Sequence, residues 1–239
     1  MKKIAIGTLL LLISANLFSQ YSVGLLVNSG IGHLKYTSEW EISQYDVWQD
    51  KPQFSYSGGI YGRYRFSDLL SMEVEAMYNR INSVWFSKDL NSITTHERKT
   101  ETNYFTFPVT MGFTFNKLTF NLGFQYSFLH KFHYTHNSDY EYNGQLRNDI
   151  EETNSRLWLI TDFDAGFVFK AQYKVFDRLN LEVRFNQGLT DLAFFPRYFA
   201  KQIYSRQLMF GVKFDLFSNI QTTGDKAGGT KSKVDLMKK

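Results

Sequence analysis

The sequence predicts an all-β protein, an eight-stranded antiparallel up-and-down transmembrane β-barrel. Three observations support this prediction. Apolar and polar residues alternate along most of the chain, as they do in a strand with one apolar and one polar face. The connections between the alternating segments are long and short in turn. Aromatic residues make up 18% of the 239 residues, with 23 Phe and 15 Tyr.

The composition excludes several other classes of protein. Mean hydropathy is −0.33, and beyond the N-terminus no apolar run reaches the roughly 18 residues of a membrane-spanning helix. A transmembrane β-strand is half polar, so these values are compatible with a barrel. Cysteine is absent, which excludes a disulfide framework, a thiolate metal site and a cysteine nucleophile.

Residues 1–19 have the pattern of a secretory signal peptide. Lys2 and Lys3 provide the positive end, a short apolar core runs from Ile4 to Ile13, and Ser19 is a suitable last residue before cleavage. We therefore expect export through the inner membrane by a cleaved signal and a barrel over residues 20–217.

Basic charge is concentrated at the two ends of the chain. The signal holds two basic residues, and the tail 218–239 holds five lysines against two aspartates. The segment between them is close to neutral, so the pI of about 9.0 does not indicate nucleic-acid binding. The tail is rich in Gly, Thr and Lys without periodicity, and we expect it to be disordered.

The first three strands are predicted over residues 21–33, 54–66 and 70–86. In each of them most of the large apolar or aromatic residues share one parity, as Tyr21, Val23, Leu25 and Val27 do. A long loop, 34–53, joins the first two strands, and a tight turn at Ser67–Leu69 joins the next two. The charged segment 87–102 is predicted to be a loop.

The clearest pattern is a hairpin from Tyr104 to His130. Every odd position from Phe105 to Phe115 is apolar, and every even position from Leu118 to Phe128 is apolar or aromatic. A two-residue turn at Asn116 and Lys117 makes Phe115 and Leu118 partners, which puts all twelve of these residues on one face. Pro108 lies inside the first strand, where it has no N–H for the ladder, so we expect a bulge or kink there with the ring toward the lumen.

The last three strands are predicted over residues 156–174, 179–189 and 203–217. The long polar segment 132–155 and the segment 190–202 are predicted loops, and Phe176–Arg178 is a tight turn. Each predicted strand has at least the roughly 9–11 residues that a tilted span needs. An unpaired backbone group in hydrocarbon costs several kcal/mol, so the sheet must close on itself. Short turns at one end and long loops at the other are typical of outer-membrane barrels.

Several of these segments resemble a known family. The run YFTFPVTMGFTFNKLTFNLGFQYSFL resembles the middle of the outer-membrane β-barrel domain common in Bacteroidetes, of the PorT-like type. Gly166, the N-x-G-L-T motif from Asn186 to Thr190 and the GVKF sequence from Gly211 to Phe214 are similar to its later strands. The resemblance covers most of 21–217 and implies an outer-membrane location without an agreed activity. Some members serve a protein-secretion and gliding system. The basic tail departs from barrels that end on their last strand.

Charged residues on the polar faces of the predicted strands form the first candidate site. These lumen charges are Arg63, Arg65, Glu73, Glu75, Asp162, Asp164, Lys170, Glu182, Arg184, Lys213 and Asp215. The turn at Ser67–Leu69 places Arg63 opposite Glu73. An eight-stranded barrel is just wide enough for side chains to fill. The charges are therefore predicted to form an ion-pair plug, with a narrow conducting path for ions or small solutes as the alternative.

Histidines and loop aromatics form two further candidates. His130, His133 and His136 are spaced by three, which on a strand points neighbours to opposite faces, so interfacial residues are predicted instead of a metal site. His130 or His133 near Asp139 is the pairing that an outer-membrane hydrolase would need. The loop residues that could contact a partner are Trp40, Trp48, Tyr140, Tyr142, Phe194, Phe195 and Tyr198.

These observations leave three functions open. The first is a non-enzymatic barrel with a filled lumen that acts through its extracellular loops as a structural, binding or secretion-accessory protein. The others are a narrow pore and a barrel enzyme. A soluble lipocalin-like barrel is a further alternative and would hold its apolar residues inside. The expected partners are outer-membrane lipid and other envelope or secretion-system proteins. We expect no nucleic acid, cofactor, catalytic residue, metal or specific small-molecule ligand.

Overall fold

The computed structural model describes residues 20–37, 46–89, 94–142, 145–153, 161–192 and 202–219. The predicted signal peptide and all but the first two residues of the predicted tail lie outside these ranges. Within them, no helix is long and apolar enough to cross a membrane.

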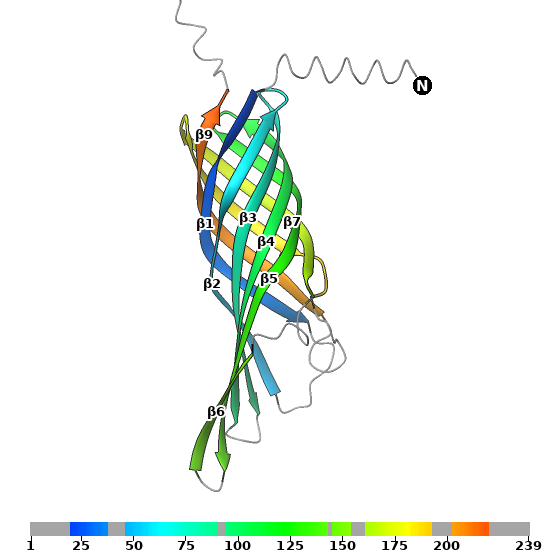
Figure 1. Ribbon diagram of the computed structural model, residues 1–239, viewed down its shortest axis with the longest axis vertical. Helices are drawn as coiled ribbons and strands as arrows, with labels where there is room; N and C mark the ends of the chain where they lie inside the picture. Colours follow the sequence, from blue (N-terminus) through cyan, green and yellow to red (C-terminus); the bar gives the residue numbers. More distant parts are fainter. Residues whose placement is uncertain are drawn as a thin grey trace, which may run out of the picture.

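Antiparallel strands form a closed ring (Figure 1). The strands of the described ranges are β1 (Gln20–Thr37), β2 (Asp46–Arg65), β3 (Leu70–Asp89), β4 (Thr95–Phe115), β5 (Leu118–Tyr142), β6 (Gln145–Thr153), β7 (Phe163–Phe176), β8 (Leu179–Gly188) and β9 (Gln202–Ser218). Eight of them follow one another around the ring, from β1 to β5 and then from β7 to β9, and β9 pairs back with β1. The predicted eight-stranded up-and-down barrel is confirmed.

The central hairpin has the predicted register. Phe115 pairs with Leu118, Phe113 with Phe120 and Met111 with Leu122. Asn116 has a φ of 56°, a conformation that Asn tolerates better than most residues with a Cβ. A two-residue turn with this geometry fixes the register of the β4–β5 ladder from the turn to the pair Tyr104–Leu129.

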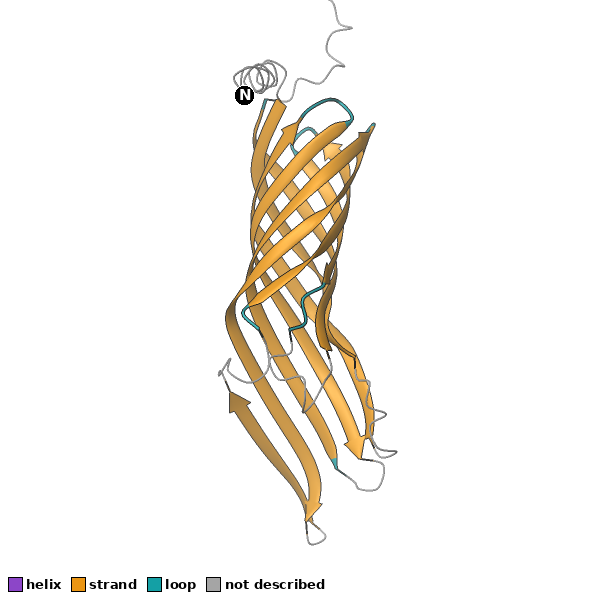
Figure 2. Ribbon diagram, turned by 90° about the vertical axis from the view of Figure 1, so that its right-hand side faces the viewer, coloured by secondary structure: helices purple, strands orange, loops and turns teal. Residues whose placement is uncertain are grey.

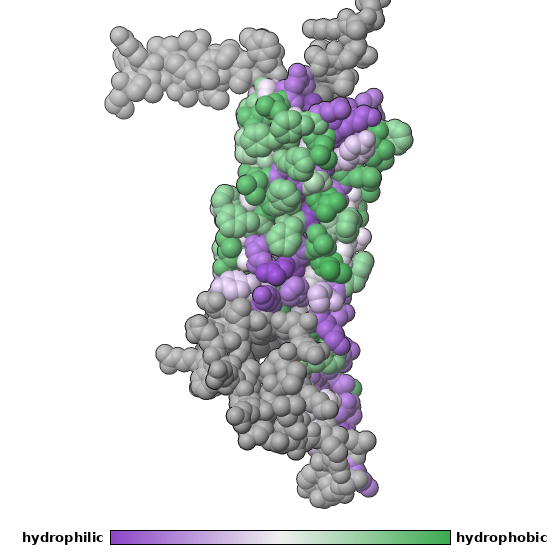
Figure 3. Space-filling view, turned by 180° about the vertical axis from the view of Figure 1, so that it is seen from behind, coloured by the Kyte–Doolittle hydropathy of each residue, from purple (hydrophilic) through white to green (hydrophobic). Residues whose placement is uncertain are grey.

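The side of the barrel that faces outward is apolar. Phe113, Phe120, Phe167 and Phe210 are exposed, with Phe210 at 60%, whereas Glu73 and Arg184 inside the ring are 0% exposed. Figure 3 shows the resulting apolar band between two polar ends. A lipocalin-like arrangement would have the opposite orientation, so the structure excludes it. Lipid is the medium that this outer surface fits.

Several strands are longer than the alternation predicts. The predicted loop 87–102 is wrong, because β3 runs to Asp89 and β4 begins at Thr95. The predicted loop 132–155 is wrong in the same way, since β5 continues to Tyr142 and pairs there with β6. The predicted loop 34–53 contains the end of β1 and the start of β2. The described part of the predicted strand 156–174 becomes regular only at Phe163.

The additional strand length was not predicted because alternation of apolar and polar residues marks only a strand with one apolar face. The additional ladder, which we call the extension, comprises the ends of β2, β3, β4 and β5 beyond the ring together with β6 (Figures 1 and 2). Both faces of the extension carry polar residues, as in the sequence THERKTET of β4. Backbone hydrogen bonds form this ladder without a hydrophobic periodicity.

Pro108 interrupts the β3–β4 ladder without causing a bulge. Its side chain is buried on the lumen side, as predicted. On the β3 side, Val74 pairs with Val109 and Met77 with Thr106, so the register is the same before and after the proline. The expected bulge is therefore wrong at this position, because the β5 side of the ladder stays continuous through the pair Pro108–Gln125. The actual bulge lies between Asn103 and Tyr104.

Candidate functional site: the barrel lumen and its two ends

An ionic cluster fills the middle of the lumen, and Glu73 of β3 is at its centre. Arg63 of β2 donates to Glu73 Oε2 over 2.7 Å from Nη2, and Lys170 of β7 and Lys213 of β9 each place Nζ 2.5 Å from Oε1. Three strands thus direct cations to one carboxylate. The side chains of Glu73, Lys170 and Lys213 are 0% exposed, so each charge depends on these partners for stabilisation.

Two more carboxylates complete the cluster. Glu75 receives Arg184 Nη2 at 2.5 Å and Lys213 Nζ at 2.6 Å. Glu182 receives Arg184 Nε at 2.9 Å and Lys213 Nζ at 2.8 Å. The alternation of β3, β8 and β9 puts all these side chains on the inward face. We define the ionic cluster as Arg63, Glu73, Glu75, Lys170, Glu182, Arg184 and Lys213.

The three carboxylates also have the geometry of a cation site. One oxygen from each of Glu73, Glu75 and Glu182 lies within 4.8 Å of the others. The ammonium groups of Lys170 and Lys213 already contact these oxygens. The positive charge that the carboxylates need is therefore supplied by the chain itself, and the donor set does not favour a metal.

A layer of mostly uncharged polar side chains lies next to the ionic cluster, toward the extension. Asn79 and Gln207 exchange two hydrogen bonds of 2.9 and 3.0 Å. Asn186 donates to the same Gln207 oxygen over 3.1 Å. Ser205 donates to Asp164 over 2.5 Å. These hydrogen-bonded, buried side chains occupy a space that a conducting path would require.

Beyond the polar layer, an apolar plug closes the end of the barrel next to the extension. It consists of Leu34, Ile81, Trp85, Tyr104, Leu129, Phe132, Leu192 and Ile203. Trp85 Nε1 donates to the carbonyl of Leu34 over 3.1 Å. The bulge pairs Asn103 with Lys131 and Tyr104 with Leu129, which shifts the parity of β5 and buries Phe132. The apolar plug was not predicted from the sequence, although the apolar residues Leu34, Ile81 and Leu129 on the polar parity were a signal for it.

The structure places the predicted lumen charges in several environments. Seven of them form the ionic cluster. Asp215 accepts a 2.5 Å hydrogen bond from Tyr61 Oη, and Asp164 belongs to the polar layer. Arg65 lies at the turn end of the lumen. The prediction that Asp162 is a lumen charge is wrong. Asp162 is exposed and precedes β7, because the regular inward and outward alternation begins only at Phe163.

Two neutral members of the lumen network, Gln172 and Tyr61, were not predicted from the sequence. Gln172 Nε2 donates to Glu182 Oε2 over 2.8 Å and to Glu73 Oε1 over 3.2 Å. The Tyr61 ring lies 4.9 Å from Lys213 Nζ. Both residues have inward parity in their strands, so parity was the signal that could have found them.

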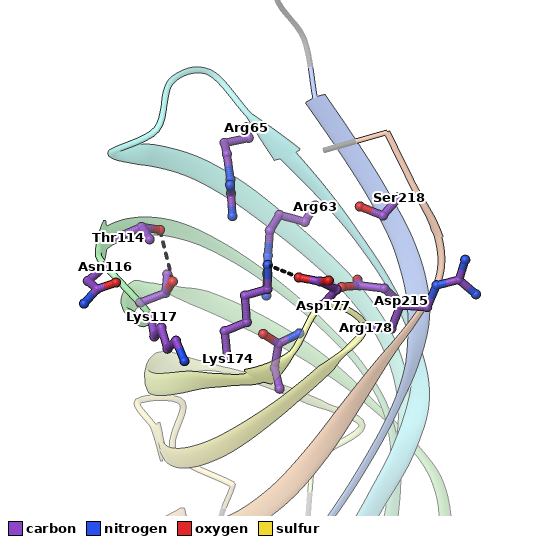
Figure 4. A pocket seen from close by; sticks show the side chains of 12 residues that line it. Arg63, Arg65, Thr114, Asn116, Lys117, Lys174, Asp177, Arg178, Asp215 and Ser218 are labelled. Carbon is purple, nitrogen blue, oxygen red and sulfur yellow. Dashed lines mark hydrogen bonds and ion pairs between the residues drawn. The ribbon is translucent and has the colours of Figure 1, made fainter. Parts of the chain in front are cut away.

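The turn end of the lumen opens into a pocket of about 230 Å³. Figure 4 shows the side chains that line it, which come from β2, from the β4–β5 and β7–β8 turns and from β9. Lys174 and Asp177 form an ion pair of 3.0 Å across its wall. The hydroxyl groups of Thr114 and Thr119 form a hydrogen bond of 3.0 Å. We call this the mouth pocket.

His130 lies at the end of the ring, and His133 and His136 lie further along β5, without the predicted pairing with Asp139. His130 packs against the Phe105 ring, with centroids 5.0 Å apart. His133 Nε2 lies 3.4 Å from the Thr135 hydroxyl. Asp139 accepts from Asn148 over 2.5 Å. The hydrolase-like arrangement of His130 or His133 with Asp139 is therefore not formed.

A different group gathers on the extension. The Ser138 hydroxyl lies 2.9 Å from His96 Nδ1 and 3.0 Å from His136 Nε2. Burial lowers the pKa of His136 below its ordinary value of 6.5, and the positive charge of Arg98 and the neighbouring His96 lower it further. His136 is therefore neutral at neutral pH.

One of the predicted contact aromatics has a described side chain. Tyr140 of β5 donates from Oη to Asp149 of β6 over 2.8 Å, and this bond with Asp149 raises the pKa of Tyr140. The side chains of the other contact residues lie outside the described part of the structure. They are Trp40, Trp48, Tyr142, Phe194, Phe195 and Tyr198.

A closed ring with an apolar exterior and a filled polar interior defines an integral β-barrel membrane protein. Residues 18–193 match the family described as "Outer membrane protein beta-barrel domain", and the chain belongs to that family. Its location is accordingly the outer membrane. A comparison with curated proteins gives no match.

Solved outer-membrane proteins are similar to this chain at low sequence identity. Neisserial surface protein A is 12% identical with a TM-score of 0.40, covering 81% of this chain and 97% of its own. Ail of Yersinia pestis is 8% identical with a TM-score of 0.37, covering 81% and 97%. OprG of Pseudomonas aeruginosa is 10% identical with a TM-score of 0.31, covering 82% and 95%.

Proposed function

We propose that this protein is a non-conducting, non-enzymatic outer-membrane barrel that presents its extension outside the cell to another envelope or secretion-system protein. One observation carries the proposal: the lumen is filled in succession by the ionic cluster, the polar layer and the apolar plug. A barrel built in this way supports a structural or binding role better than a transport role. We also propose that the barrel is of the PorT-like type and that a signal peptide at residues 1–19 directs its export.

Single-channel recording in planar bilayers tests whether the lumen is closed. We expect no stable open events from the purified wild-type barrel, because ions would have to displace ion pairs and then cross the apolar plug. Stable openings whose conductance changes on Glu73→Gln would contradict this expectation and favour the narrow-pore alternative. The folded state of each sample is checked by heat-modifiable migration on gels.

The shape of the extension supports a binding role. In outer-membrane barrels the short turns face the periplasm and the long connections face outward, so the extension points away from the cell. β6 pairs with β5 alone among the described strands, so its other edge has no partner strand in the described part of the chain. Such an edge is able to accept a strand of a partner. Ile150 on β6 is 65% exposed and adds an apolar contact.

Orientation and binding are testable in intact cells. A protease site inserted between Asn143 and Gly144 should be cut from outside, whereas the same site between Asn116 and Lys117 should be protected. A photo-crosslinking residue at Ile150 should give a protein adduct that the same residue at the lipid-facing Leu122, itself 60% exposed, does not give. Identical adducts at both positions, or none at Ile150, would refute the binding role.

Hydrolysis at Ser138 is a second candidate function. It is favoured by the two short contacts of the Ser138 hydroxyl with His96 and His136, since a histidine at hydrogen-bond distance is the ordinary activator of a serine nucleophile. Ester hydrolysis by the purified barrel that disappears in Ser138→Ala and persists in Ser127→Ala would establish this candidate over the non-enzymatic role.

A further inference from the structure

The mouth pocket carries an excess of positive charge at the end of the lumen opposite the extension. Arg63, Arg65, Lys117 and Lys174 are among its lining cations, and Asp177 and Asp215 are its carboxylates. The short turns surround it, so it faces the periplasm in the orientation that outer-membrane barrels adopt. This end of the molecule has no part in the function proposed above.

The carboxylates of the mouth pocket are already engaged. Asp177 pairs with Lys174 at 3.0 Å, and Asp215 accepts the Tyr61 hydroxyl at 2.5 Å. Arg63 in turn is held by Glu73 of the ionic cluster. None of these carboxylates therefore neutralises Arg65 through a direct contact.

Arg65 is the group that points to a ligand. Its Nε is buried and has no hydrogen-bond partner among the described residues. Figure 4 shows its side chain directed into the pocket from the end of β2, with Lys174 reaching in from β7. A buried donor without an acceptor is unfavourable, and an anionic oxygen bound here would satisfy it while balancing the surplus charge.

The size and chemistry of the pocket select the class of anion. A volume of about 230 Å³ holds roughly seven or eight waters at about 30 Å³ each, which is enough for one tetrahedral oxyanion and part of its hydration shell. The planar guanidinium of Arg binds phosphate oxygens in pairs, and Lys adds a point charge. We propose that the mouth pocket binds a phosphate group, supplied either as free phosphate or as the headgroup of a lipid in the periplasm-facing leaflet.

Calorimetric titration of the detergent-purified barrel with inorganic phosphate, at physiological ionic strength, tests the site. We expect saturable binding that Arg65→Gln weakens by about tenfold, the loss typical of one hydrogen bond to a charged group. Lys99→Gln is the matched control, since Lys99 is 58% exposed on the extension, and it should bind phosphate like the wild type. Heat-modifiable migration establishes that each variant is folded.

A second arm distinguishes the two sources of phosphate. Barrels are reconstituted in phosphatidylcholine nanodiscs with and without phosphatidic acid, and the retained lipid is identified by native mass spectrometry. Retention of phosphatidic acid that Arg65→Gln abolishes identifies a lipid headgroup, while binding of inorganic phosphate without lipid retention identifies free phosphate. The proposal is overturned if neither probe binds, if Arg65→Gln binds both like the wild type, or if acetate binds as tightly as phosphate.

Discussion

Replacing Glu73 by Gln isolates the energetic role of the ionic cluster. Lys170 and Lys213 keep Glu75 as a partner after the change, and Lys213 also keeps Glu182. Among the described residues Arg63 forms an ion pair with Glu73 alone, and its other acceptor there is the neutral Gln172. One buried cation therefore loses its charge partner, and removing one partner of a buried pair costs about 3–5 kcal/mol.

The assay is equilibrium unfolding by urea in lipid vesicles, followed by tryptophan fluorescence and by gel migration. Glu101→Gln is the matched control, because its pair with Arg80 is about 30% exposed on both sides and such pairs contribute about 1 kcal/mol or less. The double variant Glu73→Gln with Arg63→Gln should recover part of the loss, since it removes the stranded charge.

Equal stability of Glu73→Gln and Glu101→Gln would refute the reasoning. It would mean that water enters the lumen and solvates Arg63, in which case the ionic cluster could not block the lumen. Loss of stability in Glu73→Gln without recovery in the double variant would show that the cost arises from packing instead of charge.

Three further predictions concern packing, lipid contact and pH. Gly123→Ala should lower the free energy of unfolding by about 1–3 kcal/mol, because its Cβ would lie 2.6 Å from a backbone atom of the facing strand, whereas Gly62→Ala has nothing within 4 Å and should be tolerated. Leu122→Arg should cost about 2–4 kcal/mol in the apolar band, against about 0–1 for Phe115→Arg beside the turn. The lowered pKa of His136 means that the unfolded state binds more protons below the ordinary value of 6.5, so the β5–β6 ladder should lose stability as pH falls through that range. Urea unfolding measures the first two effects, and amide hydrogen exchange of β6 measures the third.

Each of these has a result that would contradict it. Equal stability of the two glycine variants would show that the β4–β5 backbones separate freely. Equal cost of the two arginine variants would mean that Leu122 does not lie in the hydrocarbon. The measured quantity is the protection of the β6 amides relative to their intrinsic exchange rate. Protection that stays independent of pH, or that keeps its pH dependence in His136→Gln, would exclude His136 as the titrating group.

The membrane-spanning part of the barrel was predictable because the lipid imposes a two-residue period. Phe115, Leu118 and their neighbours must face hydrocarbon, and the turn at Asn116 must then set the register, so composition and spacing contain this information directly. The inward direction of Glu73 and Arg184 follows from the same parity.

What only the tertiary structure decided lies where that period ends. The extension forms through backbone hydrogen bonds in a ladder that needs no apolar face, and the bulge at Asn103 and Tyr104 resets the parity of β5 so that Phe132 enters the plug. The partners of each lumen charge come from strands far apart in the chain, as Glu73 and Lys213 do. Pairing across a closed ring depends on how its strands are staggered, and that stagger is a property of the whole sheet and of no single segment.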